Sequence, residues 1–174
     1  GQEKVAYSTK DYLTAENTLQ SAASALSART SGGVRATSIQ SAIQQQDTEM
    51  RQRFGGQLSD EQRIALHRIL GSSDLSCVVG LAGSGKSTLL KTANAAWAQQ
   101  GVNVHGAALA GKAAEELRSA SGIASRTLAS IEASWENGYN PIAAGDVLVV
   151  DEAGMLGTRQ LARVTAKLHS IGAK

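Results

Sequence analysis

The sequence predicts an α/β fold with a parallel sheet, preceded by a helical N-terminal segment. Beyond the glycine pair at 55–56, short apolar runs alternate with helical patterns, which is typical of strand–helix–strand units. Before that pair, apolar residues recur at three- and four-residue intervals, which indicates amphipathic helices. We therefore expect two parts, a helical segment or linker at 1–56 and an α/β domain at 57–174.

The N-terminal part is expected to form two helices. The first spans residues 8–28, and Ser8 followed by Asp11 matches an N-terminal cap. Its polar face mixes both signs of charge, which favours packing against the neighbouring part over lying on a membrane surface. A second helix is expected at 39–54, although its glutamines at 44–46 are equally typical of disordered polar sequence.

The second part is expected to begin with a helix and continue with three strands. Ser59 and Gln62 match a capping box at the start of the segment SDEQRIALHRIL. The strands are expected at Cys77–Leu81, Val102–Leu109 and Val147–Val150, where apolar and β-branched residues run together. Such runs are typical of parallel strands buried on both faces, so Cys77 is expected to be buried.

Composition excludes several classes of protein. The 17 Lys and Arg residues nearly balance the 15 Asp and Glu residues, so the net charge of +2 does not indicate a nucleic-acid-binding arm. Cys77 is the single cysteine, which excludes a disulfide within these residues and a cysteine zinc site. No apolar run reaches about 18 residues and no signal-peptide pattern is present, so we expect a cytoplasmic protein without membrane insertion.

The segment from Gly80 to Ser87, GLAGSGKS, matches the phosphate-binding loop in every constrained position. Gly80, Gly83 and Gly85 allow the backbone to turn its N–H groups toward a phosphate. The helix that starts near Lys86 presents its positive dipole end to the same anion. We expect Lys86 to bind the β- and γ-phosphates of ATP and the Ser87 hydroxyl to bind Mg²⁺.

Two acids follow the third expected strand, where open α/β sheets bind their ligands. Asp151 is expected to hold Mg²⁺, and Glu152 is expected to orient and deprotonate the water that attacks the γ-phosphate. Taken alone, an Asp-Glu pair after a strand is equally typical of an exposed surface. Its position after a phosphate-binding loop in the same α/β pattern favours the catalytic interpretation.

Three further side chains leave alternatives open. Gln62 can complete the capping box with Ser59, or its amide can contact the adenine base, and the two uses compete for the one side chain. Trp97 and Trp135 lie in helical patterns, which favours core packing over a platform for stacking bases.

Four segments together resemble a known family: GLAGSGKST, HGAALAGKAAEEL, SGIASRTLASIEASW and DVLVVDEAGMLGTRQLARV. They are similar to the RecD-like superfamily 1 helicase region of TraA-type conjugative relaxases, the MobF class. The resemblance implies a RecA-like fold and a catalytic set of Lys86, Asp151 and Glu152. It implies nucleotide binding by Gln62, Gly80, Gly83, Ser84, Gly85, Lys86, Ser87 and Thr88. Single-stranded DNA contacts are implied for Ala110, Gly111, Lys112, Arg126 and Thr127.

In that family, ATP and Mg²⁺ drive unwinding of plasmid DNA during conjugation. The implied partners are the single-stranded transfer strand, the rest of the relaxase–helicase polypeptide and the conjugation machinery. The next family element would follow Lys174, so the RecA-like sheet is expected to be incomplete, with two unpaired strand edges at its centre. We therefore expect little ATP hydrolysis from these residues alone.

Two other functions remain as alternatives. A vestigial or regulatory module would bind single-stranded DNA or a partner without ATPase activity. The presence of Lys86, Ser87, Asp151 and Glu152 together favours the motor, because such a module has no physical need for them. A small-molecule kinase would need a lid and basic residues for an acceptor, and the sequence shows neither.

Overall fold

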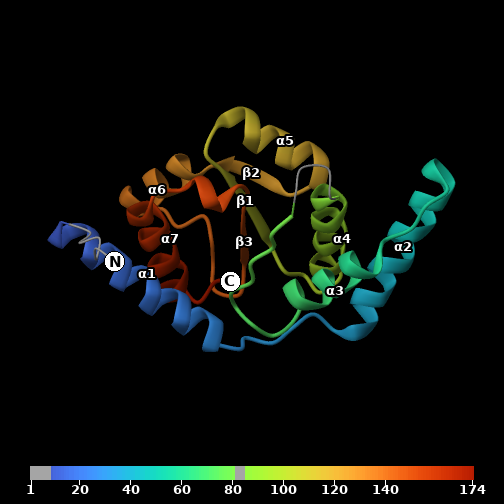
Figure 1. Ribbon diagram of the computed structural model, residues 1–174, viewed down its shortest axis with the longest axis horizontal. Helices are drawn as coiled ribbons and strands as arrows, with labels where there is room; N and C mark the ends of the chain where they lie inside the picture. Colours follow the sequence, from blue (N-terminus) through green and yellow to red (C-terminus); the bar gives the residue numbers. More distant parts are fainter. Residues whose placement is uncertain (1–8, 81–84) are drawn as a thin grey trace, which may run out of the picture.

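The computed structural model describes residues 9–80 and 85–174, and these form an α/β arrangement around a parallel sheet (Figure 1). The strands are β1 (Val104–Ala108), β2 (Ala124–Thr127) and β3 (Val147–Val150), in the order β2-β1-β3. Ala107 of β1 lies opposite Val150 of β3, and Ala108 lies opposite Thr127 of β2. The predicted fold class is confirmed, and it is consistent with an incomplete RecA-like fold.

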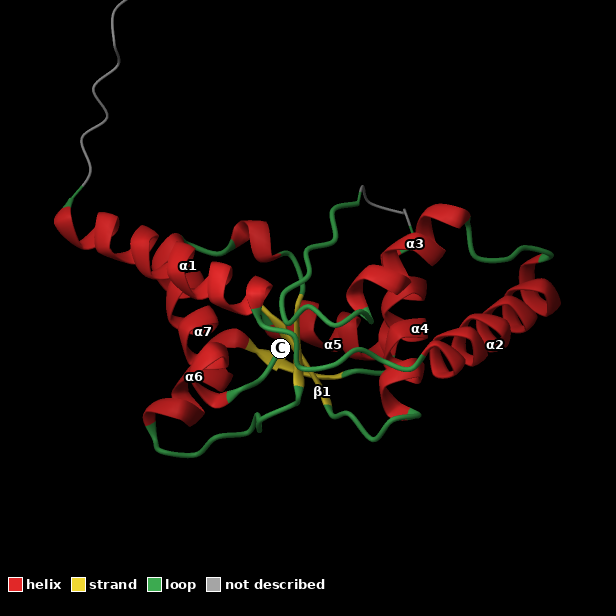
Figure 2. Ribbon diagram, turned by 90° about the horizontal axis from the view of Figure 1, so that it is seen from below, coloured by secondary structure: helices red, strands yellow, loops and turns green. Residues whose placement is uncertain are grey.

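Helices cover both faces of the sheet, as a parallel sheet requires (Figure 2). Val147 belongs to an apolar cluster with α2, α3 and α4, whereas Leu148 belongs to a second cluster with α6 and α7. Neighbouring residues of a strand point to opposite faces, so β3 joins the two clusters. The helices are α1 (Lys10–Ala28), α2 (Ala36–Phe54), α3 (Asp60–Ile69), α4 (Lys86–Ala98), α5 (Gly111–Ser121), α6 (Leu128–Glu136) and α7 (Thr158–Ile171), with a 3-10 turn, η1 (Ala153–Met155).

Helix α1 packs along α7, which confirms its interpretation as a packing helix. The Tyr12 hydroxyl lies 3.0 Å from the Thr158 hydroxyl at the start of α7, and Arg29 reaches the end of α7 at His169. The two helices therefore run in the same direction. The expected cap Ser8 lies outside the described residues, and Thr9 is the N-cap, since its hydroxyl accepts from a backbone N–H of the first turn. None of the helices in the described ranges is long and apolar enough to cross a membrane.

Helix α2 packs against α4, so its glutamine-rich stretch is helical. Ile39 and Ile43 are buried against α4, and even Gln46 is 7% exposed. Gly55 ends the helix at a φ of 69°, a value that glycine adopts without strain. Both N-terminal helices thus contact the sheet-bearing part, while a domain boundary near residue 56 stays a prediction.

Residues 77–80 do not form the predicted strand, and Leu81 lies outside the described residues. Val79 is 98% exposed and Cys77 is exposed as well, so the expectation of a buried strand is wrong. An apolar run supplies no partner for its own backbone groups, and a parallel strand is stable only in a ladder. Of the two unpaired strand edges expected, the described residues show only that of β3.

The first residues of the β3 edge are paired by the last residue of the chain. The Lys174 N–H donates to the Asp146 carbonyl at 2.9 Å, and the Leu148 N–H donates to the Lys174 carbonyl at 2.8 Å. Both bonds follow the pattern of a parallel ladder. The turn after α7 is therefore fixed against the start of β3.

Three buried aspartates are held in the ionised form by the groups around them. Asp47, Asp74 and Asp146 are 5%, 2% and 7% exposed. Burial by itself raises the pKa of each carboxyl, but hydrogen bonds and nearby positive charge outweigh it, so each pKa lies below its ordinary value. The donors are the Leu58 N–H and Arg63 for Asp47, Ser31 and Arg29 for Asp74, and the Ala143 N–H, His105 and Asn103 for Asp146.

We expect the free energy of unfolding to fall as the pH drops below about 4, the ordinary pKa of an aspartate in an unfolded chain. A carboxyl whose folded pKa is lowered contributes its full stability above the unfolded pKa and loses it as the pH falls toward the folded value. Urea denaturation between about pH 7 and about pH 3 measures this loss. Asp146→Asn should have a lower free energy of unfolding than the unmodified chain at neutral pH, and this free energy should fall less on acidification. A stability that stays constant throughout would contradict the assignment.

Candidate functional site

The two ends of the phosphate-loop segment that the structure describes, Gly80 and Gly85, both lie near the start of α4. Gly85 is the N-cap of α4 and has a φ of 79°, which suits glycine. The Lys86 ammonium donates to the Gly80 carbonyl at 3.1 Å and so connects the two ends of the loop. Gly83 and Ser84 lie outside the described residues. Ser87 and Thr88 occupy the first turn of α4.

Among the described residues, no side chain caps the N-terminus of α4, and the first turn of the helix contains no acidic residue. The first N–H groups of a helix have no partner within the helix, and the helix dipole adds partial positive charge there. A phosphate group is the ligand that such an end binds most readily.

Gln62 forms the capping box and lies against the phosphate-loop segment at the same time. Its Oε1 accepts from the Ser59 N–H at 2.9 Å, and its own N–H donates to the Ser59 hydroxyl at 3.2 Å. A Cβ placed on Gly85 would lie 2.2 Å from the Gln62 Nε2. The local interpretation of Gln62 is confirmed, and its amide nitrogen lies beside the N-cap of α4.

The acid pair lies at the carboxyl end of β3, as the sequence predicts. The Asp151 N–H donates to the Ala107 carbonyl at 2.9 Å, so β1 continues to hold the chain just beyond the strand. The Glu152 N–H donates to the Asp151 Oδ1 at 2.9 Å. The Glu152 side chain is exposed, and the Asp151 side chain is half-buried.

Glu152 has a strained backbone, which no pattern in the amino-acid sequence indicates. Its φ of 52° makes it the one non-glycine residue with a positive φ in the described ranges. A left-handed conformation costs such a residue about 1 kcal/mol or more, and strain of this kind concentrates at functional sites. The conformation turns the chain sharply into η1 directly after the acid pair.

The segment 110–112 begins α5 at the same edge of the sheet. Ala110 is the N-cap, Gly111 is the first helical residue, and Lys112 is exposed with its ammonium 3.9 Å from Glu116. Since Ala107 and Val150 lie opposite each other, the residues that follow β1 and β3 emerge side by side. The register therefore brings this segment to the edge that carries the acid pair.

Arg126 and Thr127 end β2 at that edge, but both side chains have local roles. The Thr127 hydroxyl caps α6 by accepting from the Ser130 N–H at 3.2 Å. The Arg126 guanidinium donates to the Ser130 hydroxyl at 2.7 Å and to the Ser134 hydroxyl at 3.1 Å. The spacing of Thr127 and Ser130 is the signal in the sequence that indicates this cap. The cap uses the Thr127 hydroxyl as an acceptor, which leaves its O–H able to donate to a phosphate.

The described residues show no hydrogen bond or ion pair between Lys86 or Ser87 and the acid pair. The segment that enters the phosphate loop and the end of β3 nevertheless point to the same side of the molecule, at the top of Figure 1. The parallel sheet brings the acid pair, residues 110–112 and residues 126–127 to one edge. The start of α4 lies on that side, without direct contact to the acids.

The two tryptophans are packed in the apolar clusters, as expected. Trp97 is 6% exposed in the cluster around α4. Trp135 packs against the cluster between α6 and α7, and its ring N–H donates to the Asn140 side chain at 2.9 Å. Packing rather than stacking on bases accounts for both residues.

Comparisons with known proteins relate the chain to two groups. A family described as AAA domain matches residues 57–174. A probable conjugal transfer protein TraA of Sinorhizobium fredii is 39% identical over 168 residues, which is 97% of this chain and 14% of the relative. A conjugal transfer protein TraA of Rhizobium radiobacter is 38% identical over 168 residues. One of Agrobacterium fabrum is 44% identical over 119 residues, 68% of this chain and 11% of the relative.

We expect Gly85→Ala to destabilise the protein more than Gly101→Ala. The φ values of the two glycines are +79° and +69°, so both alanines bring similar backbone strain. The Cβ at position 101 meets nothing within 4 Å, whereas the one at 85 displaces the Gln62 amide and breaks the capping box. The difference should be about 1 kcal/mol in chemical denaturation. It should vanish in a Gln62→Ala background, and equal losses in the native background would contradict the contact.

Proposed function

The chain belongs to the AAA domain family, and on that basis we propose that it is the nucleotide-binding part of an ATP-dependent DNA helicase or translocase. The similarity to TraA proteins supports conjugal transfer as the process in which it acts. The chain spans 14% of the length of the first two relatives, so the remaining polypeptide and the conjugation machinery are its proposed partners. In this proposal the whole protein unwinds plasmid DNA during transfer.

The observation that carries the proposal is the uncapped N-terminus of α4, headed by Gly85 and flanked by Lys86. No side chain of the described residues caps its N–H groups, which fit phosphate oxygens, and the first turn holds no acid that would oppose the positive dipole end. Lys86 already lies at the loop, where its ammonium donates to a backbone carbonyl. A phosphate would accept from the same ammonium as a stronger, charge-assisted partner.

The remaining residues fit a Mg²⁺-bound nucleotide. The Ser87 hydroxyl and the Asp151 carboxylate are the hard oxygen ligands that Mg²⁺ prefers. The cation, when bound, neutralises charge on the phosphates. Glu152 would orient the attacking water and accept its proton, and the strained turn that holds it supports a functional role. Gln62 would bind adenine through its Nε2, which donates no hydrogen bond to any described residue.

Single-stranded DNA would cross the edge of the sheet at residues 110–112 and at Arg126. The uncapped start of α5 supplies backbone N–H groups, and Lys112 and Arg126 supply exposed positive charge. These groups suit phosphates, whose recognition is independent of base sequence. The Arg126 guanidinium lies along α6 against two serine hydroxyls, which holds it in place.

A DNA- or partner-binding module without ATPase activity is the second candidate. One observation favours it, namely the lack of direct contact between the described phosphate-loop residues and the acid pair. Mg·ATP titration separates the two candidates. Affinity in the unmodified chain that depends on Lys86 supports the motor, and the absence of binding supports the module.

We expect Lys86→Ala to weaken Mg·ATP binding by at least about tenfold, since a hydrogen bond to a charged group is worth about 1.5–3 kcal/mol. Lys91→Ala is the matched control. Lys91 lies on the same helix, but its ammonium binds Glu49 and not the phosphate-loop segment. Isothermal titration calorimetry of both variants measures the effect. The same Mg·ATP affinity for the unmodified chain and both variants would contradict the proposed phosphate site.

We expect Arg126→Ala to weaken binding of a single-stranded oligonucleotide and to lower the salt dependence. The slope of log affinity against log salt should fall by about 0.7, the value for one lost phosphate contact on a single strand. Arg118→Ala is the control, since it removes an exposed arginine at the far end of α5, beside Glu115. Fluorescence anisotropy at several salt concentrations gives both slopes. An unchanged slope in Arg126→Ala would remove Arg126 from the DNA path.

A further inference from the structure

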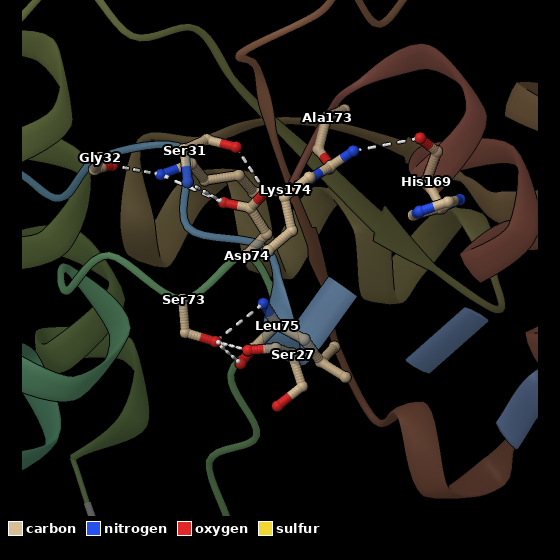
Figure 3. A network of polar contacts seen from close by, with 10 residues as sticks. Ser27, Ser31, Gly32, Ser73, Asp74, Leu75, His169, Ala173 and Lys174 are labelled. Carbon is tan, nitrogen blue, oxygen red and sulfur yellow. Dashed lines mark hydrogen bonds and ion pairs between the residues drawn. The ribbon is translucent and has the colours of Figure 1, made fainter. Parts of the chain in front are cut away.

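A buried carboxylate joins three distant segments of the chain (Figure 3). The Asp74 side chain has no exposed surface, and it accepts hydrogen bonds from the Arg29 guanidinium and from the N–H and hydroxyl of Ser31. The Lys174 ammonium lies 3.6 Å from the Asp74 Oδ1. We call these four residues, Arg29, Ser31, Asp74 and Lys174, the Asp74 clamp.

The same residues also fasten the backbone around the clamp. The Arg29 guanidinium donates to the His169 carbonyl in the last turn of α7, at 3.1 Å, and to the Ala173 carbonyl just beyond that helix. The Asp74 N–H donates to the Arg29 carbonyl at 3.2 Å. The Lys174 ammonium donates to the Gly32 carbonyl. The end of α1, the chain at Asp74 and the turn after α7 are thereby held as one unit.

The clamp lies at the base of the segment that leads to the phosphate loop. Residues 75–80 follow Asp74 directly and enter the loop at Gly80, yet they form no strand. Within the described ranges, no backbone hydrogen bond joins these residues to β3. A strand ladder would normally fix such a segment, so another interaction has to set its position.

On its other side, the clamp is connected to the strand that carries the acid pair. The Lys174 backbone pairs with Asp146 and Leu148 at the start of β3, and Asp151 follows that strand. A continuous path therefore runs from residues 75–80 through Asp74 and Lys174 to β3. Helix α1 contributes Arg29 to this path, although α1 precedes the part matched by the family.

We propose that the Asp74 clamp positions the phosphate-loop segment relative to β3, with Arg29, Asp74 and Lys174 as positioning residues for nucleotide binding. The nucleotide part of this inference rests on the proposed function. The positional part does not, because it concerns the place of residues 75–80 in the protein without nucleotide. The negative charge of Asp74 is essential to the clamp. Asn has nearly the same shape, but it would leave the partly buried cations of Arg29 and Lys174 without a counter-ion.

The test compares Asp74→Asn with Glu132→Gln in the 174-residue chain. Glu132 is a matched control, because its side chain is 13% exposed and binds Arg163 of α7, but it ties α7 to α6 instead of to residues 75–80. Cys77, the single cysteine, is exposed in the segment and accepts a spin label. A second label on Arg159→Cys, an exposed position at the start of α7, reports on the β3 side.

We expect both variants to unfold at a lower temperature, but only Asp74→Asn to broaden the distance distribution between the two labels in pulsed electron paramagnetic resonance. Only Asp74→Asn should also weaken Mg·ATP binding, by about fivefold or more, in titrations well below the unfolding temperature. Label distances and Mg·ATP affinity that match those of Glu132→Gln would overturn the proposal and leave the clamp with a role in stability alone.

Two further measurements keep the outcomes separate. If Asp74→Asn does not fold, Ser31→Ala removes one donor to the same carboxylate and should broaden the distribution to a smaller extent. A distribution as narrow as that of the unmodified chain would then overturn the proposal. If the unmodified chain binds no Mg·ATP, the proposed function fails, and the label distances alone decide whether the clamp positions the segment.

Discussion

The parallel pairing of β1 with its two neighbours is the constraint on which the proposed site depends. His105, Gly106 and Ala107 of β1 each have a partner in both β2 and β3, so the chain leaves the three strands at one edge of the sheet. The backbone bond from Asp151 to Ala107 extends this order one residue beyond the strand. Polar groups that lie far apart in the sequence thereby become neighbours without any direct contact between their side chains.

Several side chains of the proposed site already have local partners. Gln62 completes a capping box, Thr127 caps α6, and the Lys86 ammonium binds the Gly80 carbonyl. Such bonds restrict each side chain to few conformations, which reduces the entropy lost when a ligand binds. For Lys86 and the amide nitrogen of Gln62, the local partner leaves ligand binding open. The Thr127 hydroxyl accepts a hydrogen bond in its cap, and its O–H can still donate to a phosphate.

Local signals were sufficient to predict much of the fold. Helix α3 begins at the predicted capping box, and β3 has the predicted bounds because a short apolar run is confined between turns. The failure at residues 77–80 has a physical cause, since apolar composition indicates burial but a strand also requires a partner. The Asp74 clamp was beyond prediction for a similar reason. Arg29, Asp74 and Lys174 show no mutual spacing, and only the tertiary fold brings them together.

The two N-terminal helices pack on opposite sides of the sheet, α1 against α7 and α2 against α4. A shortened protein that starts at Gln57, where the family match begins, would uncover both apolar surfaces at once and lose Arg29 as well. Exposed apolar surface of that extent promotes aggregation. Expression of this region for biochemical work should therefore retain residues 9–56, even though the motifs proposed to bind nucleotide all lie beyond them.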